Sequence, residues 1–195
     1  MSEEYCGVKF RTIFRNKTVP KDKRVSQLIH WCNEFNRMGF TPGSQGSAGN
    51  LSFRTDKGFI ISCSRADFSD VSESDFVEVV GIDIDLKVVQ VDGVKGPSSE
   101  SFMHGRIYSK RKDVNAVFHG HSDDFLKWKE ELDLPITKKE EPAGTIELMN
   151  EVVKVLGTNN FILIKNHGFL SLSDSMDCAG NITMEKFSQL RKIAK

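Results

Sequence analysis

Residues 51–64 read LSFRTDKGFIISCS, two short apolar runs separated by the turn sequence DKG. This arrangement predicts a β-hairpin, because Asp and Gly accept the backbone conformations that tight turns require. A second pair of runs, VEVVGIDID at 77–85 and KVVQVDG at 87–93, predicts another hairpin. Two consecutive hairpins indicate a sheet that is mostly antiparallel.

Helical patterns lie before, between and after these strands. Residues 21–38, KDKRVSQLIHWCNEFNRM, place apolar side chains at helical spacing and end before Gly39, a helix-stop residue. The same reasoning predicts helices at 98–112, 145–156 and 176–195, a strand at 114–121, and a strand pair or one long bent strand at 159–173. Together these elements predict an α/β sandwich with a mostly antiparallel central sheet.

The chain has 195 residues, which suits one domain with a sizeable core. No long linker divides it, so we expect a single domain over 1–195, with residues 1–20 forming an N-terminal arm or an edge strand. Lys plus Arg equals Asp plus Glu at 27 each, which argues against nucleic acid or an acidic membrane as the main partner.

Compartment and cysteine usage agree with each other. No stretch approaches the roughly 20 apolar residues of a membrane helix, and MSEEYCGVKF lacks the features of a signal peptide, so we expect a cytoplasmic protein. The four cysteines, Cys6, Cys32, Cys63 and Cys178, show no CxxC spacing. They are therefore expected to be reduced thiols rather than zinc ligands.

Two histidines occur in VFHGHSDDF, residues 117–125. Residues i and i+2 of a strand share a face, so a strand ending here would turn His119 and His121 to the same side, while Gly120 would permit close packing on the other. Two imidazoles so placed can both reach one zinc ion. The alternative is a pair of ordinary histidines in a surface turn.

A third histidine, His167 in FILIKNHGFLSL, also ends an apolar run. Alone it is better explained as a core or turn histidine, but three imidazoles at the ends of apolar strands match a catalytic zinc site with an open position. The remaining two, His30 and His104, fall on predicted helices among polar neighbours. We expect both to be structural or solvent-exposed.

Two further stretches are candidates for binding an anion. Ser98 and Ser99 precede Glu100 at a predicted helix start, where free backbone N–H groups and the helix dipole favour a phosphate. Taken alone, this stretch is better explained by a simple serine N-cap with Glu100 in the first turn. Gly49 and Asn50, in GSAGNLS, could bring backbone and amide donors to an anion. Asp123 and Asp124 are better explained as solvated turn residues than as proton carriers.

Taken in order, GNLSFR, FIISCS, GPSSE, VNAVFHGHS and IKNHGFLSL resemble the class II aldolase/adducin family over roughly residues 24–190. The family contains sugar-phosphate aldolases and epimerases. The resemblance implies a three-layer α/β/α fold, a divalent metal that is usually zinc, and a homotetramer with active sites between subunits.

The resemblance also implies roles for individual residues. His119, His121 and His167 match the metal ligands, and Glu100 matches the carboxylate that acts as acid and base in aldolases. The matched phosphate contacts are Gly49, Asn50, Ser64, Ser98 and Ser99. Adducin-type members have largely lost the metal set, so its presence here favours an enzyme. Glutamate rather than aspartate at position 100 favours aldol cleavage over epimerisation.

Two departures from the family pattern concern the substrate. The loop SCSR has Arg65 where the family has glycine, and a guanidinium could instead bind the anion by its side chain. Only residues 122–166 separate His121 from His167, and they contain no tyrosine to match the family's catalytic tyrosine.

These observations predict a zinc-dependent carbon–carbon lyase acting on a small, phosphorylated sugar through a metal-stabilised enediolate. The missing tyrosine keeps open a dehydratase or epimerase with the same metal site. The altered loop and short segment keep open a non-catalytic adducin-like binding protein.

Overall fold

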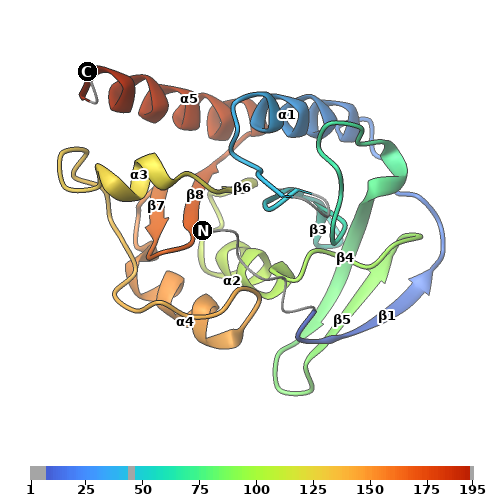
Figure 1. Cartoon of the computed structure of the whole chain (residues 1–195). Coiled ribbons are helices and arrows are strands. Elements are labelled where there is room, and N and C mark those ends of the chain that lie inside the picture. The colour runs from blue at the N-terminus through green and yellow to red at the C-terminus, as the bar shows by residue number, and fades with distance from the viewer. Residues whose placement is uncertain (1–7, 44–46, 194–195) are drawn as a thin grey trace.

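The computed structural model describes residues 8–43 and 47–193, which form one eight-stranded sheet with helices packed around it (Figure 1). The strands are β1 (Arg11–Asn16), β2 (Asn50–Arg54), β3 (Phe59–Ser62), β4 (Phe76–Asp83), β5 (Val88–Asp92), β6 (Ala116–Gly120), β7 (Phe161–Ile164) and β8 (Gly168–Ser173). The α-helices are α1 (Val25–Arg37), α2 (Ser101–Lys110), α3 (Asp123–Lys127), α4 (Ile146–Leu156) and α5 (Met176–Ile193), and a 3₁₀ turn, η1, spans Glu73–Asp75.

The strand order across the sheet is β1-β5-β4-β3-β2-β6-β8-β7. Only β1 and β5 pair in parallel, and the six other named pairs are antiparallel. The hairpins predicted from the sequence are confirmed as β2–β3 and β4–β5. Residues 159–173 form a strand pair, β7–β8, rather than one bent strand.

Side chains alternate between two hydrophobic clusters, one on each face of the sheet. In β6, Ala116 and Phe118 join the cluster built by α1 and α5, whereas Val117 joins the cluster built by α2 and α4. Figure 1 shows these two helix pairs on opposite sides of the sheet. Because both faces are buried, strands such as FILI at 161–164 are continuously apolar rather than alternating.

The chain differs from the sequence-based expectations mainly at element ends. The first helix begins at Val25 rather than at residue 21, because the Asp22 carboxylate accepts the backbone N–H of Arg24 in a turn that precedes it. The short helix α3 was not predicted, and its N-cap Ser122 accepts the N–H of Phe125. Within 1–20, residues 11–16 form the edge strand β1, and residues 1–7 lie outside the described part.

Cysteine chemistry and membrane association can be checked for the described residues. Cys32, Cys63 and Cys178 carry free thiols, and Cys6 lies outside the described part. Among the helices of residues 8–43 and 47–193, none is long and apolar enough to cross a bilayer.

The register of β2, β6 and β8 brings the ends of these three strands together. Asn50 lies opposite His119, and Gly120 lies opposite Phe169. A Cβ atom on Gly168 would stand 2.3 Å from the Gly120 carbonyl oxygen, so only glycine allows the start of β8 to approach the end of β6 this closely. The functional side chains converge at this point.

Candidate metal centre

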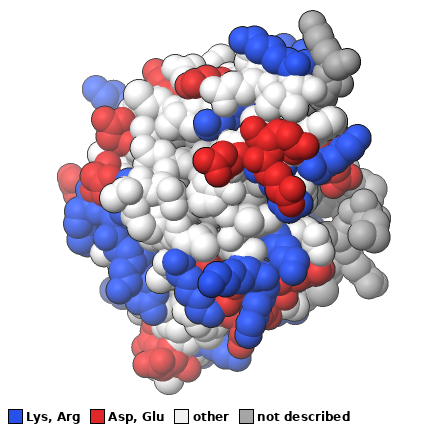
Figure 2. All heavy atoms as spheres, turned by 90° about the vertical axis from the view of Figure 1, so that its left-hand side faces the viewer, with Lys and Arg blue, Asp and Glu red and all other residues white. Residues whose placement is uncertain are grey.

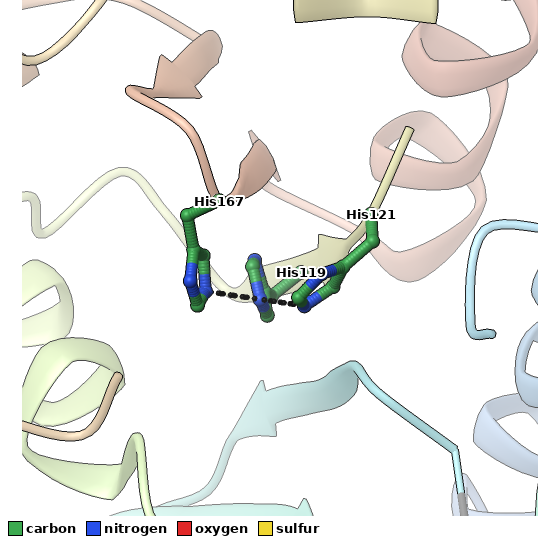
Figure 3. A group of neighbouring side chains, drawn as sticks. All are labelled: His119, His121 and His167. Atoms are coloured by element: carbon green, nitrogen blue, oxygen red, sulfur yellow. Dashed lines mark hydrogen bonds between the residues drawn. The ribbon is translucent and has the colours of Figure 1, made fainter. Parts of the chain in front are cut away.

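His119, His121 and His167 point toward one another at the end of β6 and in the turn between β7 and β8 (Figure 3). Strand β6 ends at Gly120, one residue before His121, yet both histidines of the pair face the same side as predicted. The Nε2 atom of His119 is 3.1 Å from the Nε2 of His121 and 3.1 Å from that of His167.

This spacing fits one metal ion held by three imidazoles. Nitrogens that each lie about 2.0–2.1 Å from one tetrahedral ion are about 3.3 Å from each other. The Nδ1 of His119 is 2.9 Å from the carbonyl oxygen of Phe169, and because that oxygen can only accept, Nδ1 donates and the Nε2 lone pair faces the cluster. Converging lone pairs repel one another unless a cation lies between them, so the donor set fits a divalent metal.

Glu100 is the carboxylate of this centre. It is the N-cap of α2 and only 4% exposed. Its Oε2 lies 3.2 Å from His119 Nε2 and accepts a 2.8 Å hydrogen bond from the Asn50 amide, while Oε1 lies 3.3 Å from His167 Nε2. Burial alone would raise the pKa of Glu100, but the two histidines and the Asn50 amide hold it well below its usual range. The carboxylate is therefore charged at neutral pH.

His121 is held in its neutral form. Burial disfavours the imidazolium and is the main reason that the pKa of His121 is lowered to about 2; a proton on His119 or His167 would lower it in the same direction. A histidine must be neutral to bind a metal, so His121 can act as a ligand over the whole physiological pH range.

Gly49 and Asn50, expected near an anion, lie beside the metal centre. Asn50 donates its side-chain amide to Glu100, so the anion that it meets is a carboxylate of the protein itself. Gly49 has φ +150°, and a Cβ atom there would stand 2.9 Å from the His119 carbonyl oxygen. Because glycine has no Cβ atom, the chain at Gly49 can pass close to β6 where β2 begins.

The remaining candidates lie on two loops that run side by side. The Ser64 N–H donates to the Gly96 carbonyl at 3.0 Å, and the Ser98 N–H donates to the Ser62 carbonyl at 3.1 Å. Ser98 is buried, Ser64 and Ser99 are half-buried, and Arg65 is exposed. The two loops that carry the predicted phosphate contacts are therefore adjacent, and the second of them leads into Glu100 at the start of α2.

Arg65 adopts φ +62°, the left-handed conformation that favours glycine. The loop thus keeps a glycine-like backbone although its residue is arginine. The exposed side chain extends from the same loop as Ser64, where a guanidinium fork could reach a phosphate.

Two other groups of residues lie where the sequence suggested. His104 is completely buried and hydrogen-bonded to Ser52, and His30 is exposed, which agrees with the expectation that both are structural or solvent-exposed. The sequence signal for this burial was the four-residue spacing from Glu100 to His104 and on to Tyr108, which places all three on one helix face. Asp123 and Asp124 are exposed in the first turn of α3, as their interpretation as solvated residues predicts.

We expect the stability of the metal-free protein to fall in acid partly because of His104. Burial lowers the pKa of His104 to about 3, below the 6.5 expected when it is unfolded. Between these two pH values the unfolded chain binds a proton at His104 and the folded chain does not. The contribution of neutral His104 to folding stability is therefore complete above pH 6.5 and is lost as the pH falls from 6.5 to about 3.

Between pH 6.5 and 5, His104 should lower the free energy of unfolding by about 1.6 kcal/mol. The measurement is urea unfolding of chelator-treated protein at several pH values, compared with His104→Asn. The free energy of unfolding should depend less steeply on pH in the variant, by the equivalent of about one bound proton. Identical slopes in the two proteins would contradict the assignment.

Comparison with known proteins gives one consistent family. Residues 26–186 match the family model described as the class II aldolase and adducin N-terminal domain. The L-fuculose phosphate aldolase of Escherichia coli K12 is 33% identical over 180 residues, covering 82% of this chain and 77% of the relative. The 5-deoxy-D-ribulose 1-phosphate aldolase of Bacillus thuringiensis is 28% identical over 183 residues, covering 84% of this chain and 80% of the relative.

A solved structure agrees in fold. An L-fuculose 1-phosphate aldolase superposes with a TM-score of 0.74 at 26% identity, covering 90% of this chain and 86% of that one. The similarity therefore extends over nearly all of the sheet and its helices.

Proposed function

Because the chain belongs to the class II aldolase and adducin family, we propose that it is a divalent-metal-dependent aldolase that cleaves a carbon–carbon bond in a small phosphorylated sugar. The observation that carries the proposal is the convergence of three histidine Nε2 atoms beside a buried, charged glutamate. Relatives over most of the chain are sugar-phosphate aldolases by name, which supports this substrate class.

We assign His119, His121 and His167 as the metal ligands, with Zn²⁺ as the preferred ion because three imidazoles and an open position suit it. A divalent ion held by these three histidines would supply Lewis-acid polarisation of a substrate carbonyl and so stabilise developing negative charge. Glu100 is the catalytic base and acid, since its carboxylate faces the metal centre and is charged at neutral pH. Asn50 orients that carboxylate through its amide.

The substrate phosphate is proposed to bind the loop surface formed by Ser64, Arg65, Ser98 and Ser99. Ser98 and Ser99 lie just before α2, where the helix dipole favours a negative charge. Gly49 and Asn50 complete the set where this surface meets the metal centre. An anchored phosphate would fix the sugar carbonyl relative to Glu100 and lower the entropic part of the barrier.

Several features of the assembly remain part of the proposal. We infer a three-layer α/β/α sandwich in a single domain, a cytoplasmic homotetramer with sites between subunits, and no role in nucleic-acid or membrane binding. The two clusters on the two sheet faces support the layering. Figure 2 shows basic and acidic side chains sharing one face around an uncharged area, which does not favour a polyanionic partner.

A second candidate is a dehydratase or epimerase that uses the same metal centre. It is favoured by one observation: residues 122–166 contain no tyrosine to serve as the family's proton donor. A non-catalytic, adducin-like binding protein is the third candidate, and the intact ligand set argues against it.

The three candidates are separated by the products formed. The zinc-loaded protein is incubated with L-fuculose 1-phosphate and with 5-deoxy-D-ribulose 1-phosphate, and aldehyde, dehydrated sugar and epimer are measured. The proposal expects aldehyde and dihydroxyacetone phosphate in equal amounts. Loss of water or a new epimer without aldehyde supports the second candidate, and no product from a wider panel of ketose phosphates supports the third.

We expect Arg65→Gly to weaken binding of a phosphorylated substrate without slowing chemistry. A guanidinium contact with phosphate contributes about 1.5–3 kcal/mol, so KM should rise about tenfold or more while kcat stays within about twofold. Stability should change by less than about 1 kcal/mol, because glycine relieves the strain of φ +62° but adds freedom to the unfolded chain.

Arg65→Lys is the matched variant, since it keeps the charge and loses the planar fork. An intermediate KM is expected. If KM is unchanged in both variants, the phosphate is not bound by this side chain.

A further inference from the structure

A buried polar ladder runs from the metal centre between α2 and β2. Alternate residues of β2, namely Asn50, Ser52 and Arg54, each contact a residue of one α2 face, namely Glu100, His104 and Tyr108. A step of two residues along the strand covers about 6.6–6.8 Å, and a step of four residues along the helix covers about 6 Å. Because these distances are similar, each successive residue of the strand can contact the next residue of the helix face. The first pair of the ladder belongs to the proposed metal centre, and the later pairs lie next to it.

The middle of the ladder is a hydrogen-bond chain. Ser52 Oγ lies 2.7 Å from Tyr108 OH and 2.7 Å from His104 Nδ1, and all three side chains are buried. Burial raises the pKa of Tyr108 well above its usual range, so the phenol keeps its proton. Arg54 stacks on the Tyr108 ring, with its guanidinium carbon 4.8 Å from the ring centre.

Proton counting and distances along this chain favour one tautomer of His104. The phenol of Tyr108 can donate its proton to Ser52 Oγ, and the single Ser52 proton then has two acceptors within reach, His104 Nδ1 at 2.7 Å and the Val117 carbonyl oxygen at 3.4 Å. The shorter distance favours donation to His104. Nδ1 is thus the acceptor, and the proton of the neutral ring is on Nε2. The hydrogen bonds within such a chain polarise one another, which makes each of them stronger.

The Nε2 atom of His104 has no hydrogen-bond partner among residues 8–43 and 47–193, although it is completely buried. Buried polar atoms without a partner are rare and call for a physical reason. His104 lies one helical turn after Glu100, to whose carbonyl oxygen its backbone N–H donates at 3.2 Å, and the Glu100 carboxylate lies 3.2 Å from His119 Nε2. The N–H dipole of His104 is therefore buried in the field of the metal centre, where low polarity makes it effective.

We propose that His104 is a positioning residue for Glu100: the Tyr108–Ser52 chain fixes its Nε2–H tautomer, and the resulting buried dipole keeps the Glu100 carboxylate turned toward the histidine nitrogens. The effect on catalysis rests on the proposed aldolase function. The tautomer does not, and can be measured in the protein whatever it catalyses.

The tautomer is tested by ¹H–¹⁵N long-range correlation NMR of the ¹⁵N-histidine-labelled full chain at pH 7. His104, assigned by comparison with His104→Gln, should show the Nε2–H pattern, and Ser52→Ala should abolish the preference for that pattern. An Nδ1–H or charged ring in the wild-type protein, or an unchanged pattern in Ser52→Ala, would overturn the proposal.

The positioning role is tested by comparing His104→Gln with His104→Asn in the zinc-loaded protein. Glutamine can place an amide near the Nε2 position, and asparagine can place one only near Nδ1. The kcat for aldehyde release should fall about 10–100-fold in His104→Asn and recover in His104→Gln, with KM within about twofold and zinc content unchanged.

His30→Asn and His30→Gln are matched controls at an exposed histidine and should leave kcat unchanged. Equal kcat values in the two His104 variants, or recovery in asparagine instead of glutamine, would overturn the positioning role. Thermal unfolding confirms that each variant is folded. If the wild-type chain releases no aldehyde, the proposed function fails, and the NMR experiment still decides the tautomer.

Discussion

His119→Ala is expected to remove the metal and to lower kcat/KM by about a thousandfold or more. His119 is the central ligand, because its Nε2 lies 3.1 Å from the Nε2 of both His121 and His167, and it is completely buried. Two imidazoles cannot hold a structural or catalytic zinc ion as three can. Loss of Lewis-acid stabilisation worth several kcal/mol corresponds to a rate loss of this size.

The measurement is zinc per chain by elemental analysis, together with the rate of aldehyde release. His30→Ala is the matched control, since His30 is exposed on α1, and it should retain both. Full zinc content in His119→Ala would show that the ion is bound elsewhere, and the metal-centre assignment would then be wrong.

Glu100→Gln is expected to lower kcat about 10²–10⁴-fold while the metal stays bound. The amide has nearly the same shape and can still accept the hydrogen bond from Asn50, but it cannot take up a proton at neutral pH. Because binding of substrate does not depend on proton transfer, KM should change little. A fall in kcat without a change in KM indicates an interaction made mainly in the transition state.

Glu151→Gln provides a matched control. Glu151 is also a buried glutamate, 3% exposed, but it lies on α4 and accepts the backbone N–H of Lys139. It should retain wild-type kcat. If Glu100→Gln kept more than about a tenth of wild-type kcat, Glu100 would not be the proton carrier.

Much of the fold could be predicted because local patterns and tertiary structure agree. Turn residues at DKG and alternating or continuous apolar runs gave the antiparallel pairs β2–β3 and β4–β5. Strand periodicity also placed His119 and His121 on one side, since that depends only on the geometry of β6. The short helix α3 was not predicted, because its five residues are too few to show a repeating pattern of apolar side chains at helical spacing.

The rest of the site depends on contacts between elements far apart in sequence. Asn50 reaches Glu100 only because β2 pairs with β6 in one register and α2 crosses β2 on the correct face. The same packing buries His104, whose polar neighbours in the sequence suggested a structural or exposed residue. Arg65 retains a positive φ because the neighbouring loops fix the backbone, which outweighs the preference of its own side chain.

The most direct test is the dependence of carbon–carbon cleavage on the metal. The purified chain is treated with a chelator, and aldehyde release from L-fuculose 1-phosphate is measured before and after one equivalent of Zn²⁺ per chain is restored. The account predicts that chelation abolishes cleavage, that zinc restores it in the wild-type chain, and that it does not in His119→Ala. Cleavage that continues unchanged in the metal-free chain would contradict the account.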